Sequence, residues 1–180
     1  RNARLLTEKF NATSVTEIDK RAFENCSSLN NVAIPDSVTV IRGAAFMNCT
    51  SLTSISFGSG ITDIEGECFK GCTALGDFSV PATVTEVRGN CFEGCTALKN
   101  IFLHNDIIAI HGYAFKDCTS LENIIIPDSV TTIGSNAFYG CSSLASITVA
   151  SGTTIPSTVK TIGTYAFYGC SNLTSVVVPS

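Results

Sequence analysis

Short apolar runs alternate with polar stretches along the chain, and the alternation has a fixed period. Phenylalanine recurs every 23 residues at six positions, and a cysteine and then a leucine follow each one at the same spacing. The phenylalanine column is Phe23, Phe46, Phe69, Phe92, Phe115 and Phe138. A seventh set, Phe167, Cys170 and Leu173, comes 29 residues after the sixth. A period of roughly 20–50 residues indicates a repeat architecture.

One half of each copy has the pattern of a strand. In residues 29–35 (LNNVAIP), Val32 and Ile34 fall on one side, and Asn31 and Ala33 fall on the other. Spacing with a period of two predicts a short strand. The other half, VTxIxxxAFxxC, is too short for a stable α-helix, so we expect a turn there, as short as a single 3₁₀ turn, and then a loop. One strand per copy predicts a parallel sheet with neighbouring strands about 4.8 Å apart.

These elements predict an α/β-type solenoid with little helix, in which residues 15–180 form about seven repeats. Six additional residues lie in the sixth copy, between Val149 and Val159. Residues 1–14 fit the period poorly because Lys9 and Asn11 stand where the core needs apolar side chains, so we expect a degenerate N-terminal cap or a cut repeat. The chain stops just after Pro179. We therefore expect either a fragment or a last strand whose edge a partner covers, as in end-to-end self-association through the C-terminal strand.

Composition narrows the class of protein. Apolar residues make up 44% of the 180 residues and charged residues 14%, which excludes a disordered chain. The net charge of −4, without clustered lysine and arginine, argues against nucleic acid as a partner. The longest apolar runs, such as residues 124–126, are far shorter than the roughly 18 residues of a membrane helix, so no membrane span is expected.

Nine cysteines are the sharpest chemical feature of the sequence. Seven of them recur once per copy and would stack about 5 Å apart, a spacing that permits disulfides. Stacked equivalents point the same way, however, and an in-line row does not surround a metal ion as a tetrahedral zinc site requires. We expect a row of buried thiols that pack as small apolar groups, without a metal or another cofactor. Cys68 and Cys91 fall in an alanine column and are expected to fill a buried slot there.

No catalytic constellation is apparent. His104 ends the fourth strand and His111 lies on the loop side of the fifth copy, so the two should be far apart. Neither has a serine or cysteine spaced for nucleophilic catalysis, and no catalytic residue is expected. One column alternates in charge and predicts an exposed ladder of ion pairs worth about 0–1 kcal/mol each. Its members are Asp19, Arg42, Glu65, Arg88 and His111.

The run LxxIxIPxxVxxIGxxAFxxC resembles the BspA-type class of leucine-rich repeat. The resemblance covers residues 15–180, and the Ile-Pro, Ala-Phe and Cys positions recur in step. Gly58, His104 and Ala150 depart from it where the strand would end in proline. The resemblance implies a right-handed arc with the parallel sheet on its concave face. It also implies an extracellular or cell-surface setting, because the family is frequent in adhesion and host-interaction proteins of bacteria and parasitic protozoa.

The outward positions of the strands carry the prediction of a binding site. Most are small or polar, but the fourth and fifth copies present Phe102, His104 and Ile125 side by side. Asn100 and Asn123 lie at the rim of this group. An exposed aromatic side chain beside a β-branched one is typical of an interaction patch. Tyr139 and Tyr168, at equivalent loop positions, form a weaker second candidate.

The fold alone does not fix a function. The sequence favours a non-enzymatic module of a surface or secreted adhesion-type protein that binds a protein or glycan through the concave face. The alternative is a passive structural spacer within a longer surface protein. A binder needs a bulky outward patch, whereas a spacer tolerates uniformly small outward residues.

Overall fold

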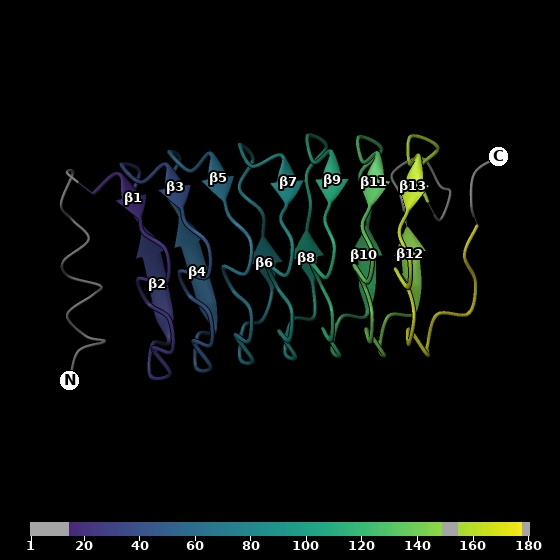
Figure 1. Cartoon of the computed structure of the whole chain (residues 1–180), viewed down its shortest axis with the longest axis horizontal. Helices are drawn as coiled ribbons and strands as arrows, with labels where there is room; N and C mark the ends of the chain where they lie inside the picture. Colours follow the sequence, from purple (N-terminus) through teal and green to yellow (C-terminus); the bar gives the residue numbers. More distant parts are fainter. Residues whose placement is uncertain (1–14, 149–154, 178–180) are drawn as a thin grey trace.

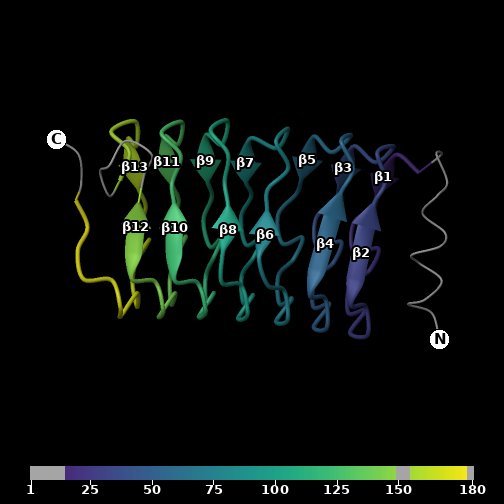
Figure 2. The same ribbon diagram turned by 180° about the vertical axis from the view of Figure 1, so that it is seen from behind.

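The structure, a computed structural model, describes residues 15–148 and 155–177 as a parallel β-solenoid. The strands form two separate rows along the stack, a long row whose strands have two to four residues and a short row whose strands all have two (Figures 1 and 2). The long row holds β2 (Asn31–Ile34), β4 (Ser54–Phe57), β6 (Phe78–Ser79), β8 (Ile101–Phe102), β10 (Asn123–Ile125) and β12 (Ser146–Thr148). The short row holds β1 (Glu17–Ile18), β3 (Val40–Ile41), β5 (Asp63–Ile64), β7 (Glu86–Val87), β9 (Ala109–Ile110), β11 (Thr132–Ile133) and β13 (Thr161–Ile162).

The expectation of one strand per copy was wrong. The short row lies in the VTxI segment, where the sequence predicted a turn. Each short strand has two residues and pairs with strands one turn away, so no local periodicity marks it. The described residues contain no helix, and therefore none long and apolar enough to cross a membrane. The predicted right-handed arc with a concave sheet and the predicted cap at residues 1–14 stay predictions, and residues 1–14 lie outside the described part.

A turn follows each short strand, as predicted, and its backbone bonds to the next copy. The N–H of Phe46 donates to the carbonyl of Cys68 (3.0 Å), and the N–H of Phe69 donates to Cys91 (2.9 Å). The same bonds recur through every described copy, and we call this row the turn ladder. Two residues of each turn adopt positive φ, as at Glu67 (61°) and Gly71 (73°), which lets alternate N–H groups point along the stack.

The phenylalanine column fills the centre of the solenoid behind the turn ladder. Consecutive rings from Phe23 to Phe167 stack nearly parallel, with centroids 5.1–5.7 Å apart. The rings from Phe46 to Phe138 are fully buried. The prediction that this column forms core pillars is confirmed.

Both rows of strands are interrupted, in contrast to the turn ladder. The long row pairs as β2 with β4, β6 with β8, and β10 with β12, whereas the short row breaks once, between β5 and β7. The spacing is visibly wider between β4 and β6, and between β5 and β7, than between the paired neighbours of each (Figure 1). The third copy therefore belongs to both parts of the stack. Its short strand β5 pairs with β3 of the copy before, and its long strand β6 pairs with β8 of the copy after.

Two features of the sequence explain the break between β4 and β6. Large rings occupy consecutive core positions, because Phe57 ends β4 and Phe78 begins β6, and they meet edge-on at 5.6 Å. The end of β4 bonds backward, since the N–H of Gly58 donates to the carbonyl of Ile34 (2.7 Å). The equivalent residue of the next copy is Pro81, which has no N–H to donate to β4. The bulk of the two rings and the missing N–H of Pro81 therefore both oppose pairing between β4 and β6.

Candidate functional site

The outward side chains of β2, β4, β6, β8, β10 and β12 form one surface, which we call the long-strand face. Along β2 the burial alternates, with Val32 and Ile34 buried and Asn31 and Ala33 exposed. The predicted strand register is therefore confirmed, and the central outward residues lie where the sequence placed them. Ala150 and Pro179, at the strand-ending position of the repeat, lie outside the described residues.

Two large apolar side chains stand out on this face. Phe102 on β8 is 56% exposed and Ile125 on β10 is 58% exposed. Their paired neighbours are small, since Phe102 lies beside Ser79 and Ile125 lies beside Thr148. We call these two side chains the apolar ridge. It is the feature of this face that an apolar partner surface could bury.

The two predicted rim asparagines make hydrogen bonds to neighbouring copies. Asn100 Nδ2 donates to Asp77 Oδ1 at 2.9 Å, and Asn123 Oδ1 accepts from Ser146 Oγ at 2.6 Å. Both pairs bridge strands that also pair through their backbones. The amides are therefore held in place beside the ridge, and Asn123 remains exposed.

His104 makes hydrogen bonds that the sequence did not predict. Its Nε2 lies 2.9 Å from the carbonyl oxygen of Val84 and 3.0 Å from that of Pro81. A carbonyl only accepts, so Nε2 carries the hydrogen, and Nδ1 accepts from the N–H of Asp106 at 3.3 Å. The ring fastens the end of β8 to the preceding copy, and its side chain is only 22% exposed. His104 therefore lies at the border of the apolar ridge and adds little exposed side chain to it.

A groove that the sequence analysis missed opens on the long-strand face between β4 and β6. Its volume is about 560 Å³. Its lining includes Ser56 and Phe57 on one side and Asp77, Ser79 and Pro81 on the other. Because Asp77 bonds to Asn100 and Ser79 pairs with Phe102, the groove lies directly beside the apolar ridge. The sequence signal for it was the displacement of phenylalanine from the second core position in one copy to the first in the next.

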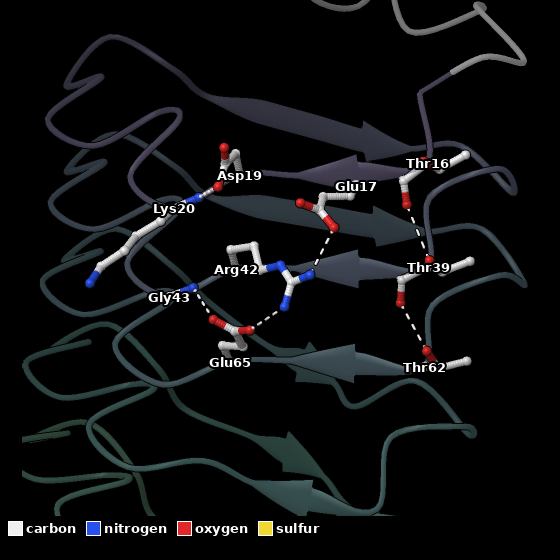
Figure 3. A network of polar contacts seen from close by, with 9 residues as sticks. All are labelled: Thr16, Glu17, Asp19, Lys20, Thr39, Arg42, Gly43, Thr62 and Glu65. Atoms are coloured by element: carbon white, nitrogen blue, oxygen red, sulfur yellow. Dashed lines mark hydrogen bonds and ion pairs between the residues drawn. The ribbon is translucent and has the colours of Figure 1, made fainter.

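The predicted charge column forms in part, on the short row (Figure 3). Arg42 bridges two copies, with its guanidinium 2.9 Å from Glu17 and 2.9 Å from Glu65. Asp19, expected beside Arg42, instead accepts from the N–H of Lys20 at 2.7 Å. The hydrogen bond from Arg42 lowers the pKa of Glu65. Since the charges of this network are satisfied by one another, they fix the register of the copies and leave little for a ligand.

The column continues with pairs that run diagonally. Arg88 lies 2.6 Å from Glu86 and 3.6 Å from Asp63, and His111 Nε2 lies 3.0 Å from Glu86. The partners thus come from the position two residues earlier, which also carries Glu17. The prediction of alternating neighbours within a single column was wrong for these pairs, because residues two apart in a strand lie on the same side of it and their side chains can meet.

The cysteines behave as the packing interpretation predicted, with one addition. All nine are free thiols, and all but Cys26 are buried. Each later ladder thiol donates to the phenylalanine carbonyl of the preceding copy, as Cys95 Sγ does to Phe69 at 3.1 Å. Burial raises the pKa of Cys72 and that of Cys91 to about 12. Among the described residues, no three histidine, cysteine or acidic side chains are grouped to hold a metal ion.

Comparison with known proteins agrees with this geometry. The model of the BspA-type leucine-rich repeat region matches residues 3–107 and 150–180, in six copies and over more than half of the chain. No curated protein sequence matches the chain. A leucine-rich repeat protein of T. pallidum has a similar structure, with 30% identity and a TM-score of 0.80 over 88% of this chain and 72% of its own.

Two further structures of bacterial proteins are similar. A leucine-rich repeat protein from Bacteroides ovatus is 32% identical, with a TM-score of 0.78 over 89% of this chain. A leucine-rich cell surface protein from Faecalibacterium prausnitzii is 34% identical, with a TM-score of 0.72 over 91% of this chain. This chain spans 40% of the first and 52% of the second. The chain belongs to the family of BspA-type leucine-rich repeat proteins.

Proposed function

We propose that the chain is a non-enzymatic binding module of a bacterial surface protein, which engages a protein or glycan through its long-strand face. The observation that carries this proposal is the apolar ridge. Phe102 and Ile125 are more than half exposed on a face of otherwise small side chains, and they contribute little to the core. Aromatic anchors of this kind dominate the energetics of protein interfaces. The relative from Faecalibacterium prausnitzii, a cell surface protein, supports the location.

The surroundings of the ridge also suit a ligand. Asn123 is exposed beside Ile125 and presents its amide at the rim. His104 and Asn100 are held by the neighbouring copy, so the border of the ridge is rigid before a ligand arrives. A rigid surface loses less side-chain entropy on binding than a mobile one. The predicted contact residues Phe102, His104, Ile125, Asn100 and Asn123 make up the proposed contact surface, which extends from β8 to the neighbouring but unpaired β10.

The test pairs a double variant with a matched control on the same face. Phe102→Ser with Ile125→Ser should leave the melting temperature within a few degrees of the parent and weaken binding to a hit from protein and glycan arrays by about 30-fold or more. Ala33→Ser with Thr148→Ser changes two exposed outward residues and should leave binding intact. If the first variant binds as well as the parent, the ridge is passive and the chain is a structural spacer.

A second contact, end to end between copies of the solenoid, is supported by the last described turn. In the sixth copy, the N–H of Asn136 donates to Thr164 and that of Phe138 donates to Ala166. The equivalent N–H groups of Tyr165 and Phe167 find no acceptor within the described residues. Tyr165 is also 61% exposed and Tyr168 58%. This end therefore has the donors and the apolar surface to receive a further turn.

The predicted last strand is not the element that would form this contact. Residues 173–177 are not in a strand, and Val176 is 40% exposed. Val178 and Pro179 lie outside the described residues. Sedimentation at increasing protein concentration should show association, and Tyr168→Lys should abolish it. A monomer at all concentrations up to about 1 mM would contradict the end-to-end contact.

A further inference from the structure

The groove between β4 and β6 is bounded by two strand edges whose backbones face each other unpaired. At the end of β4, the N–H of Gly58 donates to Ile34 on the β2 side. In a parallel strand, alternate residues direct both backbone groups to opposite neighbours. The backbone of Ser56 therefore faces β2, and the backbones of Ile55 and Phe57 face the groove.

The opposite edge has the same property. The N–H of Phe78 donates to Asn100 at 3.0 Å, and the N–H of Val80 donates to Phe102 at 3.1 Å. By the same alternation, the backbones of Asp77 and Ser79 face the groove. No ladder joins β4 to β6 in the described part of the chain, where the N–H of Gly76 donates to Thr53 at 3.3 Å before the two strands and the Thr83 hydroxyl donates to the carbonyl of Ile61 after them.

The copies on the two sides of the groove stay joined on the turn side. The turn ladder stays closed behind the groove, and the Phe46–Phe69 and Phe69–Phe92 centroid distances are 5.7 Å and 5.6 Å, against 5.1–5.4 Å in the rest of the column. The groove holds about 560 Å³. Open strand edges pair readily with an extended backbone, which supplies N–H and C=O groups at the matching spacing.

The charges around the groove indicate the composition of such a segment. Asp77 is exposed in its wall, and Asp36 lies at its strand-end side, where it accepts from Ser59 N–H at 2.7 Å. Lys99, a cation on the next strand segment of the same face, is paired with Glu122 at 3.2 Å. A segment with lysine or arginine at alternate positions would complement these carboxylates.

We infer that the groove between β4 and β6 binds an extended, basic peptide segment of a protein partner, whose backbone pairs with the edges of both strands. The inference rests on the proposed binding function of the long-strand face and names the partner as a protein. Bound in this way, the peptide would fill the interruption of the sheet and place its outer side chains against the apolar ridge.

The experiment selects from a displayed library of random octapeptides and characterises the enriched sequences as synthetic peptides. Enriched peptides should be basic, and N-methylation of alternate backbone nitrogens should weaken them at least tenfold. Asp77→Asn, which can still accept from Asn100, should weaken them about fivefold, whereas Asp19→Asn on the other row should not. Hydrogen exchange of the Ile55, Phe57 and Ser79 amides should be fast in the free protein and slow in the complex.

Several results would overturn the inference. One is the failure of any octapeptide to enrich, and another is binding that tolerates backbone N-methylation. Protection of the groove amides in the free protein would show that the sheet is already closed. If enriched peptides or an array glycan lose binding in the Phe102→Ser and Ile125→Ser variant while the groove amides still exchange fast, the binding face is right and the groove inference is wrong. If that variant binds normally, the proposed function itself fails.

Discussion

The turn ladder and the long-strand face belong to the same repeats, yet one is continuous and the other is broken. The turn ladder bonds every described copy to the next, through the backbone N–H groups of Phe and of the residues two before and two after it. The long strands pair two by two, and the interruption between β4 and β6 forms the groove beside the apolar ridge. The phenylalanine column, which is the same in every copy, lies behind the turn ladder. The long-strand positions that differ between copies lie where the pairing of the long strands is interrupted.

This difference shows how a repeat protein separates stability from recognition. In a stacked repeat, each unit contacts its neighbours, so an unbroken row on one side is sufficient to hold the stack. The other side is then free to accept changes such as Gly58 and Phe78. Stability should therefore depend strongly on the turn side and weakly on the long-strand face, and the following predictions test that order.

The largest effect should come from the phenylalanine column. Phe92 is buried and contacts Phe69, Phe78 and Phe115 with centroid distances of 4.7–5.6 Å. Phe92→Ala should lower the free energy of unfolding by about 3–5 kcal/mol through lost burial and the cavity left behind. Urea denaturation measures the loss. The matched control is Phe102→Ala on the long-strand face, which should stay within about 0.5 kcal/mol of the parent.

Equal losses in these two variants would contradict the division between the two sides. A loss below about 1 kcal/mol for Phe92→Ala would mean that the column tolerates a void, and the core would not be close-packed there.

The same division explains what the sequence could predict. The 23-residue period identified the phenylalanine and cysteine columns and the register that exposes Phe102 and Ile125, because these positions repeat in every copy. It did not identify the short strands, whose two residues pair with other copies. It also missed the groove, which depends on how the rings of Phe57 and Phe78 meet across two copies. Pairing between neighbours, unlike periodicity, requires coordinates.

The thiol ladder should give an intermediate effect. Cys95→Ala removes a buried sulfur and the hydrogen bond that it donates to Phe69, so it should cost about 1–2 kcal/mol. Cys91→Ala is the matched control, because Cys91 occupies a buried column in which other copies carry alanine, such as Ala45 and Ala114. It should cost less than half as much in the same denaturation measurement. A reversed order would contradict the assignment of the Sγ hydrogen bonds.

The raised pKa of Cys91 predicts that the stability of the protein depends on pH. Burial raises its pKa to about 12 in the folded state from 9.0 in the unfolded chain. Protonated thiol is therefore favoured by folding, so the associated stability is complete below pH 9 and is lost as the pH rises toward 12. Urea midpoints between pH 7 and pH 11 should fall above pH 9, and the fall should be shallower in Cys91→Ala. Parallel curves for the two proteins would exclude this cause.

Backbone conformation on the turn side should give a smaller effect of opposite sign. Glu67 has a φ of 61°, in the left-handed region that costs a side-chain-bearing residue roughly 1–2 kcal/mol. Glu67→Gly should therefore be about 0.5–1 kcal/mol more stable than Glu67→Ala, after the greater entropy of unfolded glycine is included. The comparison of the two variants by thermal and urea denaturation isolates the backbone from the lost carboxylate. Equal stability would show that the turn is not strained at this residue.

The smallest effect should come from the polar pairs of the long-strand face. Asn123 Oδ1 accepts from Ser146 Oγ at 2.6 Å, but Asn123 is exposed and water can replace its partner. A double-mutant cycle with Asn123→Ala and Ser146→Ala should give a coupling free energy of about 0.5 kcal/mol or less. The same cycle on binding to a ligand of this face should give a larger coupling, because burial by the ligand removes the competing water. A stability coupling above about 1.5 kcal/mol would show that this pair holds the sheet together, and the long-strand face would then share the structural role of the turn ladder.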